Sequence, residues 1–237
     1  MNIVTVTVFR YQDNARFRAF ANMGRWLMKP IPVPGLQFGK LMGSGQNFGL
    51  LPDWSTYVFL GVWSDLPTAR QFPQSPLFQQ LRTGTESVST LYITPQRSHG
   101  LWSGQNPFQP ESDTVIPVDP QAPVAVLTRA TIRTRALPDF WRHVPQARQR
   151  LQEQGDQILF GIGVGEVPII QQCTISVWRS PAAVEQYAYR QSGHKEVVRL
   201  TRQRNWYAEE LFARFRVLGA EGELFTEIAN QLTDNQS

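Results

Sequence analysis

The chain has 237 residues, of which 41% are hydrophobic and 18% are charged, and its formal net charge is +4. This composition indicates a packed globular protein and excludes a disordered or fibrous chain. Because the basic excess comes from scattered arginines and not from clusters within a recognisable recognition module, we do not expect nucleic acid as a partner.

The first half of the chain predicts six elements in the order strand, helix, strand, strand, helix, strand. The first strand alternates, with Ile3, Thr5, Thr7 and Phe9 on one face. An amphipathic segment then predicts a helix, and a glycine-rich run predicts the second strand. The six elements occupy residues 2–11, 14–28, 36–45, 58–63, 69–72 and 86–96, and a polar turn with a proline precedes the second helical segment.

The second half repeats this order. Trp178 matches Trp63 at the end of an apolar strand, and in both places a proline-containing turn and a helical segment follow. The last run places Leu211 and Phe215 on one face and predicts a strand, although "AEELFAR" also suits a helix. The elements occupy residues 123–133, 136–152, 158–166, 173–178, 184–187 and 207–217.

Each half therefore has the ferredoxin-like β-α-β-β-α-β order, whose sheet has helices on one face only. Two separate domains of this kind would leave both uncovered sheet faces in water, whereas two sheets pressed together form a barrel with a cavity between them. We predict an α+β protein of the dimeric α/β barrel type. Repeat 1 occupies residues 1–95, a linker 96–122, repeat 2 residues 123–219, and a C-terminal tail 220–237.

The single cysteine, Cys173, lies in an apolar run and has no partner for an internal disulfide, so an oxidising compartment is not indicated. The first residues lack the pattern of a signal peptide, and no stretch approaches the roughly 20 apolar residues of a membrane span. We therefore expect a cytoplasmic protein. Its mildly basic surface also suits peripheral contact with anionic lipid headgroups.

Glycine strings, carboxylate pairs and metal motifs do not predict a site in this chain. "GIGVGE" lacks both the spacing and the following helix of a dinucleotide fingerprint, and "GSGQNFG" indicates a connecting loop. Paired carboxylates, metal-spaced Cys/His groups and a Ser/His/Asp order do not stand out. Of the three histidines, His99 is expected in a solvated loop and His143 at the boundary of a helix.

His194 is the histidine in the most suggestive position. If Ser192 caps a helix, His194 lies in its first turn, with Val197, Val198 and Thr201 on the same face. The positive end of the helix dipole favours the neutral imidazole, which is the form that binds metals. A histidine at the edge of the core is the other interpretation of this pattern.

Two pairs of arginines share strand faces. Arg129 and Arg133 lie in one predicted strand, and Arg214 and Arg216 lie in another. Exposed arginines on a strand are common and need no special explanation. If these faces point into the barrel, however, the guanidinium groups need anionic partners such as carboxylates, because an unpaired buried charge is costly.

Several long blocks make the chain resemble the spheroidene monooxygenase family, the bacterial acyclic-carotenoid ketolases. The blocks follow one order from about Ile3 to Gly219, so the resemblance covers nearly the whole chain and leaves out the tail. They are "FGKLMGSG", "VWSDLPTA" and "ITPQRSHGLWSGQNPF" in the first half, and "PVAVLTRATIR", "FWRHVP", "GIGVGEVPIIQQCTISVW", "GHKEVVR" and "WYAEELFARFRVLG" in the second.

The resemblance implies a monooxygenase that uses haem b and inserts oxygen from O2 at the C2 end of an acyclic carotenoid such as spheroidene. Its electrons would come from a ferredoxin-type donor, and a homo-oligomer is compatible with the fold. In related haem barrels a helix histidine of the carboxy-terminal half binds the iron, and His194 fits that role here. Cys173, in the middle of a strand, is not expected to be the ligand.

The resemblance also gives the other candidates a role. The propionates would be bound by the arginines, and the apolar slot between the sheets would be lined by aromatic side chains, for which core packing is the other interpretation. A cofactor-free small-molecule oxygenase and a non-catalytic haem-binding protein on the same barrel remain as alternatives. The expected cofactor-binding residues are His194, Arg129, Arg133, Arg214, Arg216, Trp178 and Phe215, with Phe160 as a further lining residue.

Overall fold

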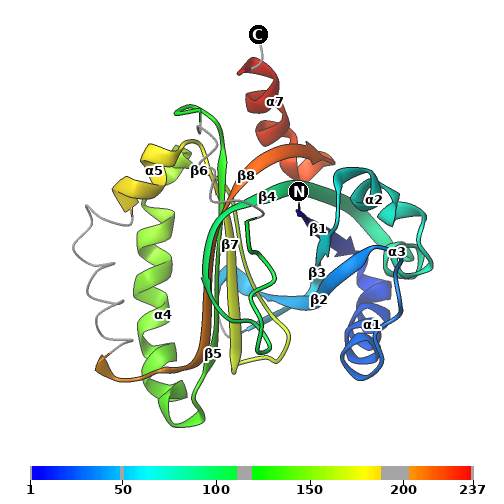
Figure 1. Ribbon diagram of the computed structural model, residues 1–237. Helices are drawn as coiled ribbons and strands as arrows, with labels where there is room; N and C mark the ends of the chain where they lie inside the picture. Colours follow the sequence, from blue (N-terminus) through cyan, green and yellow to red (C-terminus); the bar gives the residue numbers. More distant parts are fainter. Residues whose placement is uncertain (1, 49–50, 111–118, 188–202, 236–237) are drawn as a thin grey trace.

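Eight strands form a closed antiparallel barrel in the computed structural model, which describes residues 2–48, 51–110, 119–187 and 203–235 (Figure 1). The order around the barrel is β1-β3-β2-β6-β7-β5-β8-β4. The strands are β1 (Ile3–Tyr11), β2 (Leu36–Gly45), β3 (Pro52–Trp63), β4 (Thr85–Gly100), β5 (Val124–Ile132), β6 (Ile158–Gly165), β7 (Gln171–Trp178) and β8 (Tyr207–Glu221).

Each half contributes four neighbouring strands in the ferredoxin-like order. The first half runs β4-β1-β3-β2 and the second runs β8-β5-β7-β6. The two repeats also share a register, because Trp63 pairs with Ile3 and Trp178 pairs with Val124. The predicted α+β fold of two ferredoxin-like repeats in a dimeric α/β barrel is therefore confirmed.

The two seams between the repeats differ in length. Strands β4 and β8 pair from Thr90–Glu221 to Gly100–Leu211, whereas β2 and β6 pair only at Gly43–Gly165 and Ser44–Val164. The long seam extends β4 to Gly100, beyond the expected start of the linker at residue 96, because the backbone of β8 needs a partner along its length. The alternation in the last run thus forms a strand, not a helix.

Helices cover the outside of both half-sheets, and α7 packs at one end of the barrel in the expected tail (Figure 1). The segments after β3 and β7 begin with the same kind of cap, since Asp65 accepts a hydrogen bond from the Thr68 amide and Ser180 from the Ala183 amide. Among the described residues, no helix is both long enough and apolar enough to cross a membrane. The helices are α1 (Arg16–Met28), α2 (Leu66–Gln71), α3 (Pro76–Arg82), α4 (Leu137–Gln152), α5 (Pro181–Glu185) and α7 (Thr226–Asp234).

The interior of the barrel is filled by side chains, which corrects the expectation of an apolar slot between the two sheets. The segment after β4 folds inward and buries Trp102 and Phe108 completely. The ring of Trp102 contacts Phe38 at 5.5 Å, and the ring of Phe108 contacts Phe215 at 5.1 Å. Part of the expected linker therefore belongs to the core that joins the two repeats.

We predict that Trp102→Ala lowers the free energy of unfolding by about 3–5 kcal/mol, because it leaves a cavity in the centre of the barrel. Urea denaturation followed by far-UV circular dichroism measures the change. Leu101→Ala is the matched control, since the neighbouring Leu101 side chain is 46% exposed and its loss should cost less than about 0.5 kcal/mol. Equal losses in the two variants would contradict the inferred role of Trp102.

Candidate functional site

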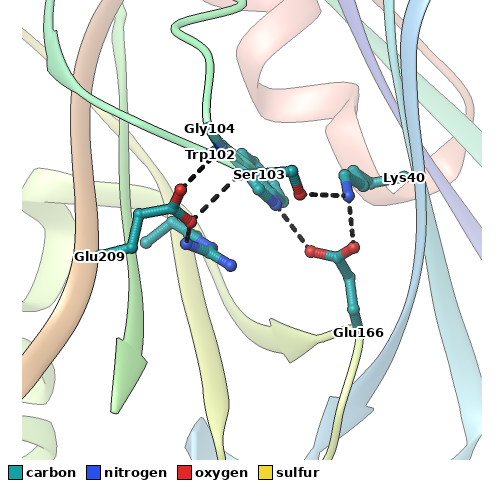
Figure 2. Close-up of polar contacts among 7 residues, drawn as sticks. Lys40, Trp102, Ser103, Gly104, Glu166 and Glu209 are labelled. Atoms are coloured by element: carbon teal, nitrogen blue, oxygen red, sulfur yellow. Dashed lines mark hydrogen bonds and ion pairs between the residues drawn. The ribbon is translucent and has the colours of Figure 1, made fainter. Parts of the chain in front are cut away.

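A polar network surrounds Trp102 inside the barrel, and its members come from both repeats (Figure 2). The indole nitrogen of Trp102 donates to Glu166 at 2.6 Å, and the other oxygen of Glu166 lies 2.6 Å from the Lys40 ammonium. Lys40 also donates to the Ser103 hydroxyl at 2.9 Å. Each charge in this network has a partner of opposite sign. The network therefore links the two repeats and does not offer an unpaired group for catalysis.

Arg129 belongs to the same interior and is only 4% exposed. Its guanidinium forms an ion pair with Glu209, which also accepts hydrogen bonds from the backbone amides of Ser103 (3.1 Å) and Gly104 (2.8 Å). Burial alone would raise the pKa of Glu209, but these amides and Arg129 lower it below its usual value. The anionic partner of Arg129 is therefore a carboxylate of the protein, in place of the expected propionate.

The main cavity lies outside the barrel, between the second half-sheet and helix α4, and has a volume of about 440 Å³. Its sheet wall consists of alternate residues of β5, β7 and β8. Its helix wall is one face of α4, formed by residues spaced three to four positions apart. Drug-sized ligands occupy cavities of this size. Its described apolar and aromatic lining residues include Val126, Trp178 and Phe212 from the sheet and Phe140, Val144 and Leu151 from α4.

A difference in side-chain size between the repeats explains this cavity. The register places Phe59 of the first half where the second half has Thr174, and Tyr57 where it has Gln172. In the first half these aromatic rings are buried under the helices, with Phe9 beside them. The smaller side chains of the second half leave the corresponding space open beneath α4.

Positive charge gathers at the cavity. Four arginines line it, together with a single described carboxylate, that of Glu185. One amino group of Arg150, Nη1, is buried without a hydrogen-bond partner in the described structure. Such an arrangement suits an anionic group on an otherwise apolar ligand. The arginines are Arg97, Arg148, Arg150 and Arg214.

The structure separates the residues that were predicted to share a site. Trp178 and Arg214 line the main cavity. Phe215 and Arg129 are instead buried inside the barrel, because both lie on the opposite face of the sheet. The side chains of Arg133, Arg216 and Phe160 are not among the described lining residues, and Phe160 packs against Phe225 with ring centroids 4.9 Å apart.

One histidine lines the cavity, and another contacts a lining residue, although the sequence assigned neither to a site. His143 lines the cavity, and its Nδ1 is 2.8 Å from the carbonyl oxygen of Asp139. His99 lies in β4 and not in a loop, with its ring stacked on that of Phe212 at 5.3 Å. The i, i+4 spacing of Asp139 and His143 on a helix is the signal in the sequence that could have placed His143.

Asp139 also anchors the chain that returns to the barrel before β8. Its carboxylate accepts hydrogen bonds from Arg204 at 2.7 Å and from the Trp206 indole at 2.9 Å. The hydrogen bond from Arg204 is the main cause of a lowered pKa at Asp139. Both Tyr187 and Trp206 line the cavity. The predicted ligand His194 lies between them in the sequence, outside the described residues.

Several known proteins are similar to this chain in sequence or in fold. No protein-family model matches the chain. The spheroidene monooxygenase of Cereibacter sphaeroides is 34% identical over 228 residues, which are 94% of this chain and 69% of that protein. The spheroidene monooxygenase of Rhodobacter capsulatus is 30% identical over 226 residues, 94% of this chain and 92% of that protein. A solved aldoxime dehydratase in complex with butyraldoxime shares the fold, with a TM-score of 0.55, 12% identity, and coverage of 92% of this chain and 79% of that one.

The Arg129–Glu209 pair predicts a specific pH dependence of stability. Because the pKa of Glu209 is lower in the folded chain than the ordinary value of 4.5, its ionised form stabilises the fold above that pH. This contribution is lost as the pH falls below it. We expect Glu209→Gln to lower the free energy of unfolding by about 3 kcal/mol at pH 7, because it leaves the buried charge of Arg129 without its anionic partner.

The same variant should lose less stability than the wild type on acidification. Urea titrations at neutral and acidic pH measure both effects. Glu210→Gln controls for the removal of one negative charge at the adjacent, exposed position of β8. An identical decrease in stability with acid in wild type and Glu209→Gln would show that this carboxylate is not the group responsible.

Proposed function

Because the chain belongs to the spheroidene monooxygenase family, we propose that it is a haem-dependent enzyme that inserts oxygen from O2 at the C2 end of an acyclic carotenoid such as spheroidene. The family assignment itself identifies it as a monooxygenase. The structural observation that supports the finer proposal is the cavity under α4, with apolar walls and several arginines. A long polyene needs apolar walls, and a macrocycle with carboxylate groups needs both apolar walls and cationic partners.

The residues of this cavity fit a haem. The aromatic and aliphatic walls suit the macrocycle, while Arg148, Arg150 and Arg214 suit its propionates. The unpartnered Nη1 of Arg150 supports this assignment, since a buried donor without an acceptor is costly. Arg214 keeps the propionate role expected from the sequence, and Arg148 and Arg150 take the place of Arg129.

His194 is the proposed iron ligand. It follows Tyr187, a described lining residue of the cavity, by seven positions, and seven residues reach at most about 25 Å. Trp206 lines the cavity on the other side of His194 in the sequence. When bound, haem supplies the binding and reductive activation of O2. One oxygen atom enters a C–H bond of the substrate and the other leaves as water, with two electrons from a ferredoxin-type donor and two protons.

The chain's own residues would bind the substrate and keep water out. Trp178 and Phe212 form apolar walls, and the Trp178 indole donates to Ser176 at 2.9 Å, which satisfies its polar atom within the protein. His143 is one of the described groups that can hold or move a proton there. Because the carbonyl oxygen of Asp139 only accepts, Nδ1 of His143 is protonated, so Nε2 of the neutral ring is the basic atom.

An optical spectrum tests the cofactor and its ligand. We expect purified full-length protein supplied with haem to show a Soret band that is lost or shifted in His194→Ala. His143→Ala is the matched control, because it removes an imidazole that lines the same cavity and should keep the band position of the wild type. Loss of the band in His143→Ala with its retention in His194→Ala would contradict the proposed ligand. No band in the wild type would favour a cofactor-free oxygenase.

A cavity-filling variant tests where the carotenoid binds. Thr174→Phe gives the second half the ring that the first half has at Phe59, and Thr174→Val is the control of unchanged size. In cells that accumulate spheroidene, we expect Thr174→Phe to lower the oxygenated product by about tenfold or more through steric exclusion, and Thr174→Val to retain it. Wild-type product levels from Thr174→Phe would place the substrate elsewhere, and haem binding without any product would indicate a non-catalytic protein.

A further inference from the structure

Helix α1 exposes an apolar strip on its outer side. Phe17 and Met28 are 83% and 82% exposed, and Phe20 and Leu27 are each 46% exposed. At 3.6 residues per turn, Phe17 and Met28 point directly away from the barrel, and Phe20 and Leu27 lie along one flank. We call these four residues the apolar ridge. A helix on the surface of a water-soluble domain normally has polar residues in these positions.

Positive charge lies on the other flank of the same helix. Arg18 and Arg25 are exposed there, and Lys29 is exposed directly after the last residue of the helix. The sequence contains no acidic residue between Asp13 and Asp53, and Asp13 is paired with Arg16 at 2.6 Å. The outward surface of α1 therefore combines large apolar side chains with a net positive charge.

A small pocket opens beside the ridge. The ring of Phe20 contacts Trp54 in an edge arrangement at 5.3 Å, and both line this pocket of about 80 Å³. Ile169 and Trp141 are also among its lining residues. The pocket and the main cavity share Phe48 and Gln172. The small pocket beside α1 and the cavity under α4 therefore adjoin each other at Phe48 and Gln172.

We propose that the apolar ridge of α1 docks on the surface of an anionic lipid bilayer, and that the adjacent pocket passes a membrane-dissolved hydrocarbon to the main cavity. Exposed aromatic and aliphatic side chains next to arginine and lysine are the chemistry that binds such an interface. A second copy of the chain fits less well, because an antiparallel isologous contact through α1 would place the basic flanks of both copies on the same side of the contact. The transfer of substrate rests on the proposed function, whereas the docking does not.

Vesicle co-sedimentation of the full chain without carotenoid tests the docking. We expect binding to vesicles of equimolar phosphatidylcholine and phosphatidylglycerol, and weaker binding to phosphatidylcholine alone. Phe17→Ser/Met28→Ser should lower the partition coefficient by about tenfold or more, because it removes the two most exposed apolar groups. Arg18→Gln/Lys29→Gln should lower binding to the anionic vesicles selectively. Arg70→Gln/Arg135→Gln has the same loss of charge outside α1 and should bind like the wild type.

Circular dichroism of each variant checks that the fold is retained. Absence of wild-type binding to the anionic vesicles, or wild-type binding by Phe17→Ser/Met28→Ser, would overturn the proposal. A second result would also overturn the proposal. In it, the wild type does not bind vesicles but forms a concentration-dependent dimer in sedimentation velocity, and Phe17→Ser/Met28→Ser abolishes this dimer. Since the assay needs neither turnover nor substrate, its failure is distinguishable from a failure of the proposed oxygenation.

Discussion

Trp102 is held between Lys40 and Arg129 inside the barrel, with the two cations 6.0 and 5.6 Å from its ring and with Glu166 bound to its indole nitrogen. Lys40 belongs to the first repeat, Arg129 and Glu166 to the second, and Trp102 to the segment between them. A closed barrel has no free sheet edges, but its centre must still be filled at the density of a protein interior. The Trp102 indole fills this centre together with Phe108 and contacts charged groups of both repeats, so the two repeats share one core.

The two repeats have the same topology and different tasks. Large aromatic rings such as Phe9 and Phe59 close the space between the first half-sheet and its helices, so that half supplies stability. Thr174 and Gln172 leave the same space open in the second half, and the charged and apolar groups of a binding site gather there. Duplication of one fold thus permits a cavity to form in one copy, because the other copy retains a complete core.

The sequence predicted the strand order well, because the repeats and the matching Val-Trp strand ends are properties of the chain itself. It did not predict which face of β5 points inward, since Leu127 and Arg129 alternate with Val126 and Thr128, and both faces are partly apolar. Glycine, proline and serine around Trp102 suggested a linker, whereas burial of this side chain depends on contacts far away in the sequence. Alignment of Phe59 with Thr174 was the available signal for the cavity.

The shorter of the two seams between the repeats should open more readily than the longer one. The β2–β6 seam is closed at Gly43–Gly165 and Ser44–Val164, so its separation breaks fewer backbone hydrogen bonds than separation of β4 from β8. Amide hydrogens there should exchange with solvent faster than those of the long seam. Phe48 packs against Gly163 of β6 and lines both pockets. Local opening of the shorter seam would therefore move the Phe48 side chain that separates the two pockets, while the remainder of the barrel stays folded.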